Sequence, residues 1–269
     1  MSIIGLKKAN CKHCYKCLKS CPVKSIEVVG GQAKIIERSC VLCGTCLLVC
    51  PQHAKTLESD LALVQGWVRA GEPVAVSLAP AFTGSFEGTG KQMVTALLKL
   101  GFARVSETAL GAAYVTAEFA RMVREEKMEH IITSCCPVVN DFIEKHHPDM
   151  IPYLAPVVSP MIAHAQLLRQ TLGEGVKVVF IGPCIAKKQE ARDIRHDGLV
   201  DAVLTFDDLA TWLDQAGVRP QDMEETPFFN ANPSVARMYP VPGGVNETVQ
   251  RLMGARSHRH YKLLDVTGL

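Results

Sequence analysis

The sequence has no long hydrophobic run, and this excludes one class of protein at the outset. No stretch of about 18 consecutive apolar residues occurs, so we expect no membrane span. The chain opens with MSIIGLKKANCKHC, which has neither the apolar core nor the small-residue cleavage site of a signal peptide. We therefore expect a protein that is neither inserted in a membrane nor exported.

Strong charge and nucleotide-binding loops are missing as well. The formal net charge is only +2 at pH 7, which gives no sign of polyanion binding, and we expect no nucleic-acid partner. Neither G-x-G-x-x-G nor a P-loop is present. The pair Gly243-Gly244 is too short for a phosphate loop and predicts a turn.

What the chain has in quantity is cysteine. Its 269 residues contain eleven cysteines, clustered at metal-ligand spacing rather than scattered. Without an export signal, this clustering indicates thiolate ligands in a reducing cytoplasm rather than disulfides. Hydrophobic residues make up 48% of the chain, enough for one small and one medium domain. We place the boundary between residues 58 and 59.

Residues 1–58 contain the same cysteine pattern twice. Each copy reads C-x2-C-x2-C-x3-C-P, the run of a two-cluster bacterial ferredoxin, in which three cysteines bind one cube and the fourth crosses to the other. The expected ligands of one 4Fe-4S cluster are Cys11, Cys14, Cys17 and Cys50, and those of the second are Cys40, Cys43, Cys46 and Cys21. Residues 26–29 and 33–36 predict a hairpin between the repeats. Zinc and disulfides are the alternatives, and the doubled spacing favours the clusters.

Two apolar runs in the second domain each end at a cysteine. Residues 131–137 read IITSCCP and predict a buried strand that delivers Cys135 and Cys136 into a turn. Residues 176–181 predict another strand, followed by Cys184. Because ligands of open α/β sheets bind beyond the carboxyl ends of the strands, Cys136 and Cys184 are expected at the same sheet edge. The alternative is a set of buried core cysteines.

The rest of residues 59–269 alternates between predicted helices and strands. Helices are expected near residues 61–68, 95–100, 112–125, 159–172 and 207–215, and strands at 74–78, 103–106 and 202–205. This order predicts an α/β fold, with a mostly parallel sheet covered by helices, joined to an α+β ferredoxin-like domain. The histidines His146, His147, His164, His258 and His260 have no carboxylate or cysteine at metal-ligand spacing. The pairs 146/147 and 258/260 are expected in solvated loops.

The chain resembles the iron-iron hydrogenase family. TSCCP (residues 133–137) matches the first signature of that family, and PCIAKKQE (residues 183–190) matches the second signature, PCxxKxxE. Residues 77–81, 159–160 and 201–205 agree further. The resemblance implies reversible exchange of protons and electrons with H2. The implied cofactor is a 4Fe-4S cube bridged to a diiron unit that carries carbon monoxide, cyanide and a dithiolate.

The resemblance also implies residue roles. Cys136 and Cys184 would bind the cube, and Cys135 would pass protons, unless it is a packed core thiol. Lys187 would donate to a cyanide, with a surface lysine like Lys188 as the alternative, and Ser159 would either continue the proton path or cap a helix. Further cofactor contacts are expected from the family-signature and loop residues Pro80, Ala81, Ser134, Pro183 and Glu190.

The sequence departs from the family in several places. Gly182 stands where many members carry methionine, and Val139 stands where a tryptophan follows TSCCP. The acidic relay residue of typical members falls near Ala109, with Glu107 close by. The third signature, which supplies two more cube ligands, is absent, so the expected ligand set is incomplete. Residues 261–264 predict a strand cut off before its continuation, and we expect either a truncated chain or a partner subunit that supplies the rest.

Three functions remain open at this point. The first is a hydrogenase, catalytic or H2-sensing, served by a redox partner such as ferredoxin or another electron-transfer protein and by maturation proteins for the diiron unit. The second is an electron-transfer or iron-sulfur assembly protein of the hydrogenase-like type. The third is a ferredoxin fused to an interaction domain without a third cluster.

Overall fold

The computed structural model describes residues 2–126, 128–230, 234–254 and Leu264. The predicted strand at residues 261–264, Leu264 apart, and the histidines His258 and His260 lie outside the described residues. Within the described part, none of the helices combines the length and the apolar character needed to cross a bilayer.

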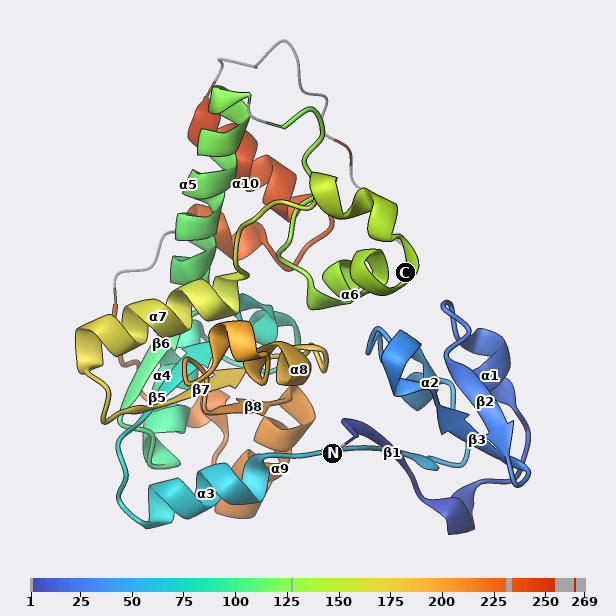
Figure 1. The fold of residues 1–269 in the computed structure, drawn as a ribbon. Coiled ribbons are helices and arrows are strands. Elements are labelled where there is room, and N and C mark those ends of the chain that lie inside the picture. Colours follow the sequence, from blue (N-terminus) through green and yellow to red (C-terminus); the bar gives the residue numbers. More distant parts are fainter. Residues whose placement is uncertain (1, 127, 231–233, 255–263, 265–269) are drawn as a thin grey trace.

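The N-terminal part is a small α+β unit, to the right in Figure 1. It contains strands β1 (Ile4–Leu6), β2 (Ile26–Val29), β3 (Gln32–Ile35) and β4 (Lys55–Leu57) and helices α1 (Lys16–Ser20) and α2 (Thr45–Leu48). Strands β2 and β3 pair antiparallel, as the hairpin prediction requires, and β1 pairs antiparallel with β4. The predicted ferredoxin-like arrangement is therefore confirmed.

The second part is built on a four-stranded parallel sheet in the order β6-β5-β7-β8. Its strands are β5 (Val74–Leu78), β6 (Arg104–Glu107), β7 (Lys177–Ile181) and β8 (Ala202–Leu204). The helices are α3 (Leu61–Arg69), α4 (Gly90–Lys99), α5 (Ala109–Glu125), α6 (Pro137–His146), α7 (Pro160–Leu172), α8 (Lys187–Ala191), α9 (Phe206–Ala216) and α10 (Gly244–Met253). This architecture confirms the predicted fold class.

Helices cover both faces of the sheet, and this explains its uninterrupted apolar strands. In Figure 1, α7 lies over one face, while α3 and α9 lie over the other. All five residues of β5 are buried, with Val74, Val76 and Leu78 in the main core. Helices α5 and α10 pack together beyond α7 and form a second, smaller core around Phe119 and Val249.

One strand prediction is wrong. Residues 131–135 do not belong to the four-stranded sheet. Among the described residues, their only β-pairing is an isolated parallel bridge from Ile132 to Leu154. A short apolar run predicts that the segment is buried, but it does not predict which strand the segment pairs with. The two adjacent cysteines instead precede α6, in which Pro137 occupies the first turn.

Candidate metal centres

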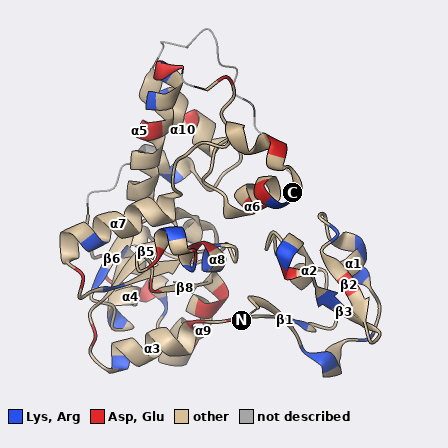
Figure 2. Ribbon diagram, in the orientation of Figure 1, with Lys and Arg blue, Asp and Glu red and all other residues tan. Residues whose placement is uncertain are grey.

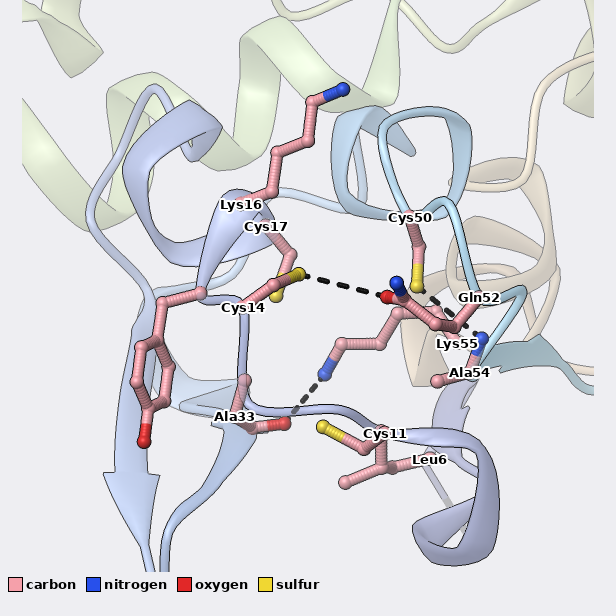
Figure 3. Close-up of a pocket in the computed structure, with 11 residues that line it drawn as sticks. Leu6, Cys11, Cys14, Lys16, Cys17, Ala33, Cys50, Gln52, Ala54 and Lys55 are labelled. Atoms are coloured by element: carbon pink, nitrogen blue, oxygen red, sulfur yellow. Dashed lines mark hydrogen bonds between the residues drawn. The ribbon is translucent and has the colours of Figure 1, made fainter.

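The eight cysteines of the N-terminal part line two separate pockets. Cys11, Cys14, Cys17 and Cys50 surround the first pocket, together with Lys16 and Lys55, as Figure 3 shows. Cys21, Cys40, Cys43 and Cys46 surround the second pocket. Each pocket thus combines three cysteines of one repeat with the last cysteine of the other, the crossed grouping that a two-cluster ferredoxin uses.

The backbone around both pockets has matching left-handed residues. The left-handed residues of the first repeat are His13, Tyr15 and Lys24, and those of the second are Leu42, Gly44 and His53, 29 positions further on in each case. Left-handed conformations are uncommon for residues other than glycine. Successive turns of this kind direct backbone N–H groups into a concave nest, a geometry found at iron-sulfur sites.

Several of these N–H groups reach cysteine sulfur. The backbone N–H of Ser25 donates to Cys21 Sγ and that of Ala54 donates to Cys50 Sγ, both at 3.3 Å. These bonds favour thiolates: although burial acts against it, the backbone donors lower the pKa of Cys50. Burial raises the pKa of Cys46 to about 11, opposed by the charge of Lys55.

Lys55 is the cation shared by the two pockets. It is buried, and its Nζ donates to Ala33 O at 2.7 Å. Burial raises the pKa values of Cys17 and Cys46, and the charge of Lys55 opposes this rise and contributes to the lowered pKa of Cys50. Among the described residues, no three His, Cys, Asp or Glu side chains converge closely enough to bind a single metal ion. Pockets lined by four thiols, with amide donors and one buried cation, fit a 4Fe-4S cube better than a single zinc ion.

A third group of thiols lies in the second part of the chain. Cys136 is the N-cap residue of α6, and Cys184 lies between β7 and α8. Burial raises the pKa of Cys184, and the nearby Cys136 thiol raises it further by charge repulsion, while Lys187 opposes both. The two segments therefore bring Cys136, Cys184 and Lys187 into one electrostatic environment.

Cys135 occupies the apolar side of this group. It packs in the smaller core beside Tyr239, and burial raises its pKa to about 12, so that the thiol stays protonated at neutral pH. Lys187 Nζ lies 3.4 Å from Cys135 O and 2.7 Å from Glu190 Oε2. The Lys187 and Glu190 side chains are each only 10% exposed, which excludes the surface-lysine interpretation of Lys187.

Ser159 has an unexpected environment. It is the N-cap residue of α7, yet its side chain makes no capping bond, and its buried Oγ has no partner among the described residues. Asn140 Oδ1 is a second such atom, while Asn140 Nδ2 donates to Ser134 O at 3.0 Å. Ser134 Oγ donates to Val157 O. Buried polar atoms without partners are rare and indicate a missing water or ligand near this group.

The loops after β5 and β7 meet at the same sheet edge. Ala79 N–H donates to Ile181 O at 2.8 Å, so that Pro80 and Ala81 follow β5 where Gly182 and Pro183 follow β7. Gly182 has no room for a side chain, because a Cβ there would lie 2.7 Å from the Phe180 ring and 2.9 Å from the Ala79 Cβ. A methionine at position 182 would not fit without rearrangement.

The second cysteine pocket packs directly against the third thiol group. Ile185, which follows Cys184, lies 3.5 Å from where a Cβ on Gly44 would be, and both Cys184 and Ile185 join the core of the N-terminal part. Lys145 Nζ donates to Cys40 O at 2.8 Å, and His146 Nε2 pairs with Ser39 O at the same distance. Both side chains come from α6, the helix that Cys136 begins.

Three polar residues in the second part, Lys188, His164 and Glu107, are buried by contacts with residues far away in the sequence. Lys188 is fully buried, contrary to the surface position expected for it. His164 of α7 is fully buried between Ser77 Oγ at 2.7 Å and Ser106 Oγ at 2.9 Å.

Glu107 forms the third such contact. It is buried and accepts two bonds from Arg237 Nε at 3.0 Å. Burial raises the pKa of Glu107, and Arg237 opposes the rise. Arg237 is separated from Glu107 by 130 positions, so no local sequence pattern predicts the pair.

The thiol sites and the fold together define an iron-sulfur protein with a dicluster domain joined to an α/β domain. Residues 72–267 match the model of the iron only hydrogenase large subunit, C-terminal domain, and residues 3–51 match that of the 4Fe-4S dicluster domain. The chain belongs to the iron-only hydrogenase family.

Relatives of two kinds match more than half of the chain. The chain is 26% identical to the NADP-reducing hydrogenase subunit HndD of Solidesulfovibrio fructosivorans, over 90% of this chain and 49% of that protein. It is 28% identical to the cytosolic Fe-S cluster assembly factor NAR1 of Vanderwaltozyma polyspora, over 71% of this chain and 40% of that protein. The chain thus spans half or less of the length of these curated relatives.

A solved structure matches the fold. The [FeFe]-hydrogenase HydA1 of Chlamydomonas reinhardtii superimposes with a TM-score of 0.61 and 23% identity, over 79% of this chain and 62% of that one. At this identity the match establishes the fold alone.

Proposed function

We propose that the protein carries electrons through two 4Fe-4S clusters to a third iron-sulfur centre at Cys136 and Cys184, where protons and H2 are interconverted. The observation that carries this proposal is the contact between the second cysteine pocket and the Cys184 loop, with Gly44 against Ile185. A continuous packed path between thiol sites is what electron transfer to a buried centre requires. The reducing cytoplasm is the compartment in which exposed thiolate ligands of this kind persist.

The residues present fit the third centre in part. An all-cysteine cube takes four thiolates. The second part of this sequence supplies Cys136 and Cys184, with Cys135 beside them. When bound, a diiron unit joined to such a cube supplies the site at which H2 is split or formed. The chain's own residues hold protons and positive charge around that position.

Cys135, Lys187 and Ser159 have distinct proposed roles. Cys135 holds a proton on sulfur in an apolar environment, where a thiol carries no permanent charge. Lys187, held by Glu190, presents a buried positive charge suited to a small anionic ligand. The unpartnered Ser159 Oγ is available to accept or donate a proton at the edge of this group. Ser134, Pro80, Ala81 and Pro183 would contact the bound cofactor from the surrounding loops.

A second candidate function is iron-sulfur assembly or electron transfer without a diiron unit. The crowding at Gly182 favours it, because the methionine that many hydrogenases carry against the diiron unit has no room there. The likeness to the NAR1 assembly factor supports the same alternative. Under this proposal the partners are iron-sulfur proteins rather than maturation proteins for a diiron unit.

An infrared spectrum separates the two candidates. The protein would be purified without oxygen, reconstituted with iron and sulfide, and treated with a synthetic diiron precursor. Carbon monoxide and cyanide stretching bands that stay with the protein after desalting are expected for the first function. A spectrum without these bands, from a sample that keeps its 4Fe-4S clusters, would support the assembly function instead.

A further inference from the structure

The two cysteine repeats differ sharply in charge. The first repeat, residues 11–24, contains Lys12, Lys16, Lys19 and Lys24, and Lys7 and Lys8 lie just before it, with no Asp or Glu anywhere in residues 7–24. The second repeat, residues 40–53, contains no Lys, Arg, Asp or Glu. The two loops have the same backbone and the same cysteine spacing, so the fold does not require this difference.

The two repeats also differ in what covers them. The uncharged second repeat faces the rest of the protein: Leu42 is buried, and Cys40 O accepts a hydrogen bond from Lys145. The first repeat faces solvent, with Cys14 and Lys16 both exposed. Figure 1 shows α2 of the second repeat toward the larger part and α1 of the first repeat on the far side. The first pocket is therefore the outer end of the electron path.

Compensation of cluster charge does not account for the five lysines Lys7, Lys8, Lys12, Lys16 and Lys19, which we call the lysine surface. Both pockets are expected to hold a cluster of the same charge, yet only the outer repeat carries lysines. The buried Lys55 already serves both pockets. All five lysines are exposed, and none of them has an ion-pair partner in the part of the chain that the structure describes. Figure 2 shows this positive charge on α1 and on the turn that precedes the first cysteine.

We propose that the lysine surface binds an acidic electron-carrier protein and that electrons enter or leave at the first cluster. The inference rests on the proposed electron-transfer function and adds the docking surface and the charge of the partner. In the reducing direction, the carrier is oxidised by one electron and the first cluster is reduced by it. Complementary charge speeds such encounters by steering, and salt weakens the effect.

A stopped-flow experiment tests the docking surface. The anaerobically reconstituted full-length protein would be mixed with a reduced, acidic two-cluster ferredoxin, and cluster reduction would be followed by absorbance. The variant Lys12→Glu/Lys16→Glu is compared with Arg69→Glu/Lys99→Glu, which changes the net charge equally at exposed positions on α3 and α4. Reduction by a small viologen serves as the reference for intact clusters.

The expected result is a second-order rate constant at least about tenfold lower for Lys12→Glu/Lys16→Glu at low salt, with the difference shrinking as salt is added. The Arg69→Glu/Lys99→Glu control should stay within about twofold of the wild type, and both variants should react normally with viologen. Equal rates for the two double variants, or a rate that rises with salt, would overturn the proposal. A loss of clusters would appear in the viologen reference, and a lack of hydrogen chemistry would leave this test unaffected.

Discussion

Cys135 is the residue on which hydrogen chemistry depends most in this account. Its thiol is protonated at neutral pH because burial raises its pKa to about 12, and it adjoins the proposed ligand Cys136. We expect Cys135→Ser to lower hydrogen evolution at least about a hundredfold, because a hydroxyl is a far weaker acid in the same pocket. Activity with reduced viologen measures this loss, while the electron paramagnetic resonance signals of the clusters should be unchanged. Unchanged activity would remove Cys135 from the proton path.

His164 gives a prediction about pH. Burial lowers its pKa to about 4, so the folded protein keeps the ring neutral while the unfolded chain protonates it near pH 6.5. The stability from this neutral ring is fully present above pH 6.5 and is lost as pH falls toward 4, by about 3 kcal/mol at most. A nuclear magnetic resonance titration should show the His164 ring neutral at pH 5.5. A midpoint near 6.5 for this ring would contradict the burial argument.

At the scale of single residues, the sequence predicts how the cysteines group better than it predicts which polar side chains are buried. The doubled cysteine run is enough to predict that Cys11, Cys14, Cys17 and Cys50 line one pocket, because in a two-cluster ferredoxin the last cysteine of each run crosses to the other cluster. The burial of Lys188 and His164 could not be predicted, since their partners Asp60 and Ser77 lie 128 and 87 positions away. A polar side chain can be buried when residues distant in the sequence supply its hydrogen bonds or counter-charge, and no local sequence pattern predicts such partners.

Two helical glycines allow a matched test of element packing. Gly111 of α5 lies against α7, where an added Cβ would stand 2.2 Å from Pro160 O. Gly66 of α3 has nothing within 4 Å of the same position. We expect Gly111→Ala to destabilise the protein by about 1–3 kcal/mol through overpacking. Gly66→Ala should stabilise it by up to about 1 kcal/mol through helix propensity.

Urea unfolding followed by tryptophan fluorescence measures both effects, since Trp67 and Trp212 lie in α3 and α9 of the larger part. A stabilising shift for Gly111→Ala, like the one expected for Gly66→Ala, would contradict the close α5–α7 contact.

The segment between the two parts is held by charge. Asp60 accepts from Lys188 Nζ at 3.2 Å and from the Val203 backbone N–H at 3.1 Å, and Arg192 pairs with Glu58 at 2.7 Å. Asp60→Asn should cost about 3–5 kcal/mol, because it leaves the fully buried Lys188 charge without a counter-charge.

A double-mutant cycle with Lys188→Met, read by the same unfolding experiment, checks this. The double variant should lose less than the sum of the single losses, because it leaves no lone buried charge. Strict additivity would show that the pair is not coupled.

Among whole elements, the parallel strands were the easiest to predict. Residues 74–78 and 176–181 are covered on both faces of the sheet, so they appear in the sequence as uninterrupted apolar runs that are easy to recognise as strands. The run 131–135 has a similar composition but forms only one bridge, because no neighbouring strand is placed to extend it. Helix α6 was missed although Pro137 at its first turn is a recognised start signal.

For the whole molecule, the sequence predicts two parts and their classes, but their contact had to come from the structure. The packing of Gly44 on Ile185 and the bonds from Lys145 and His146 join loops that are over 100 positions apart. These contacts turn three separate thiol groups into one ordered series. The series explains why the charged repeat is outermost and the uncharged repeat lies inside.

The central claim is that Cys136 and Cys184 bind a third iron-sulfur centre beside the second cluster. Iron and sulfide counted per chain in the reconstituted protein and in the variant Cys136→Ser/Cys184→Ser test it most directly. With three centres we expect about twelve irons in the wild type and about eight in the variant, whose two ferredoxin-type clusters should keep their resonance signals. Equal iron content and equal spectra in the two proteins would contradict the claim.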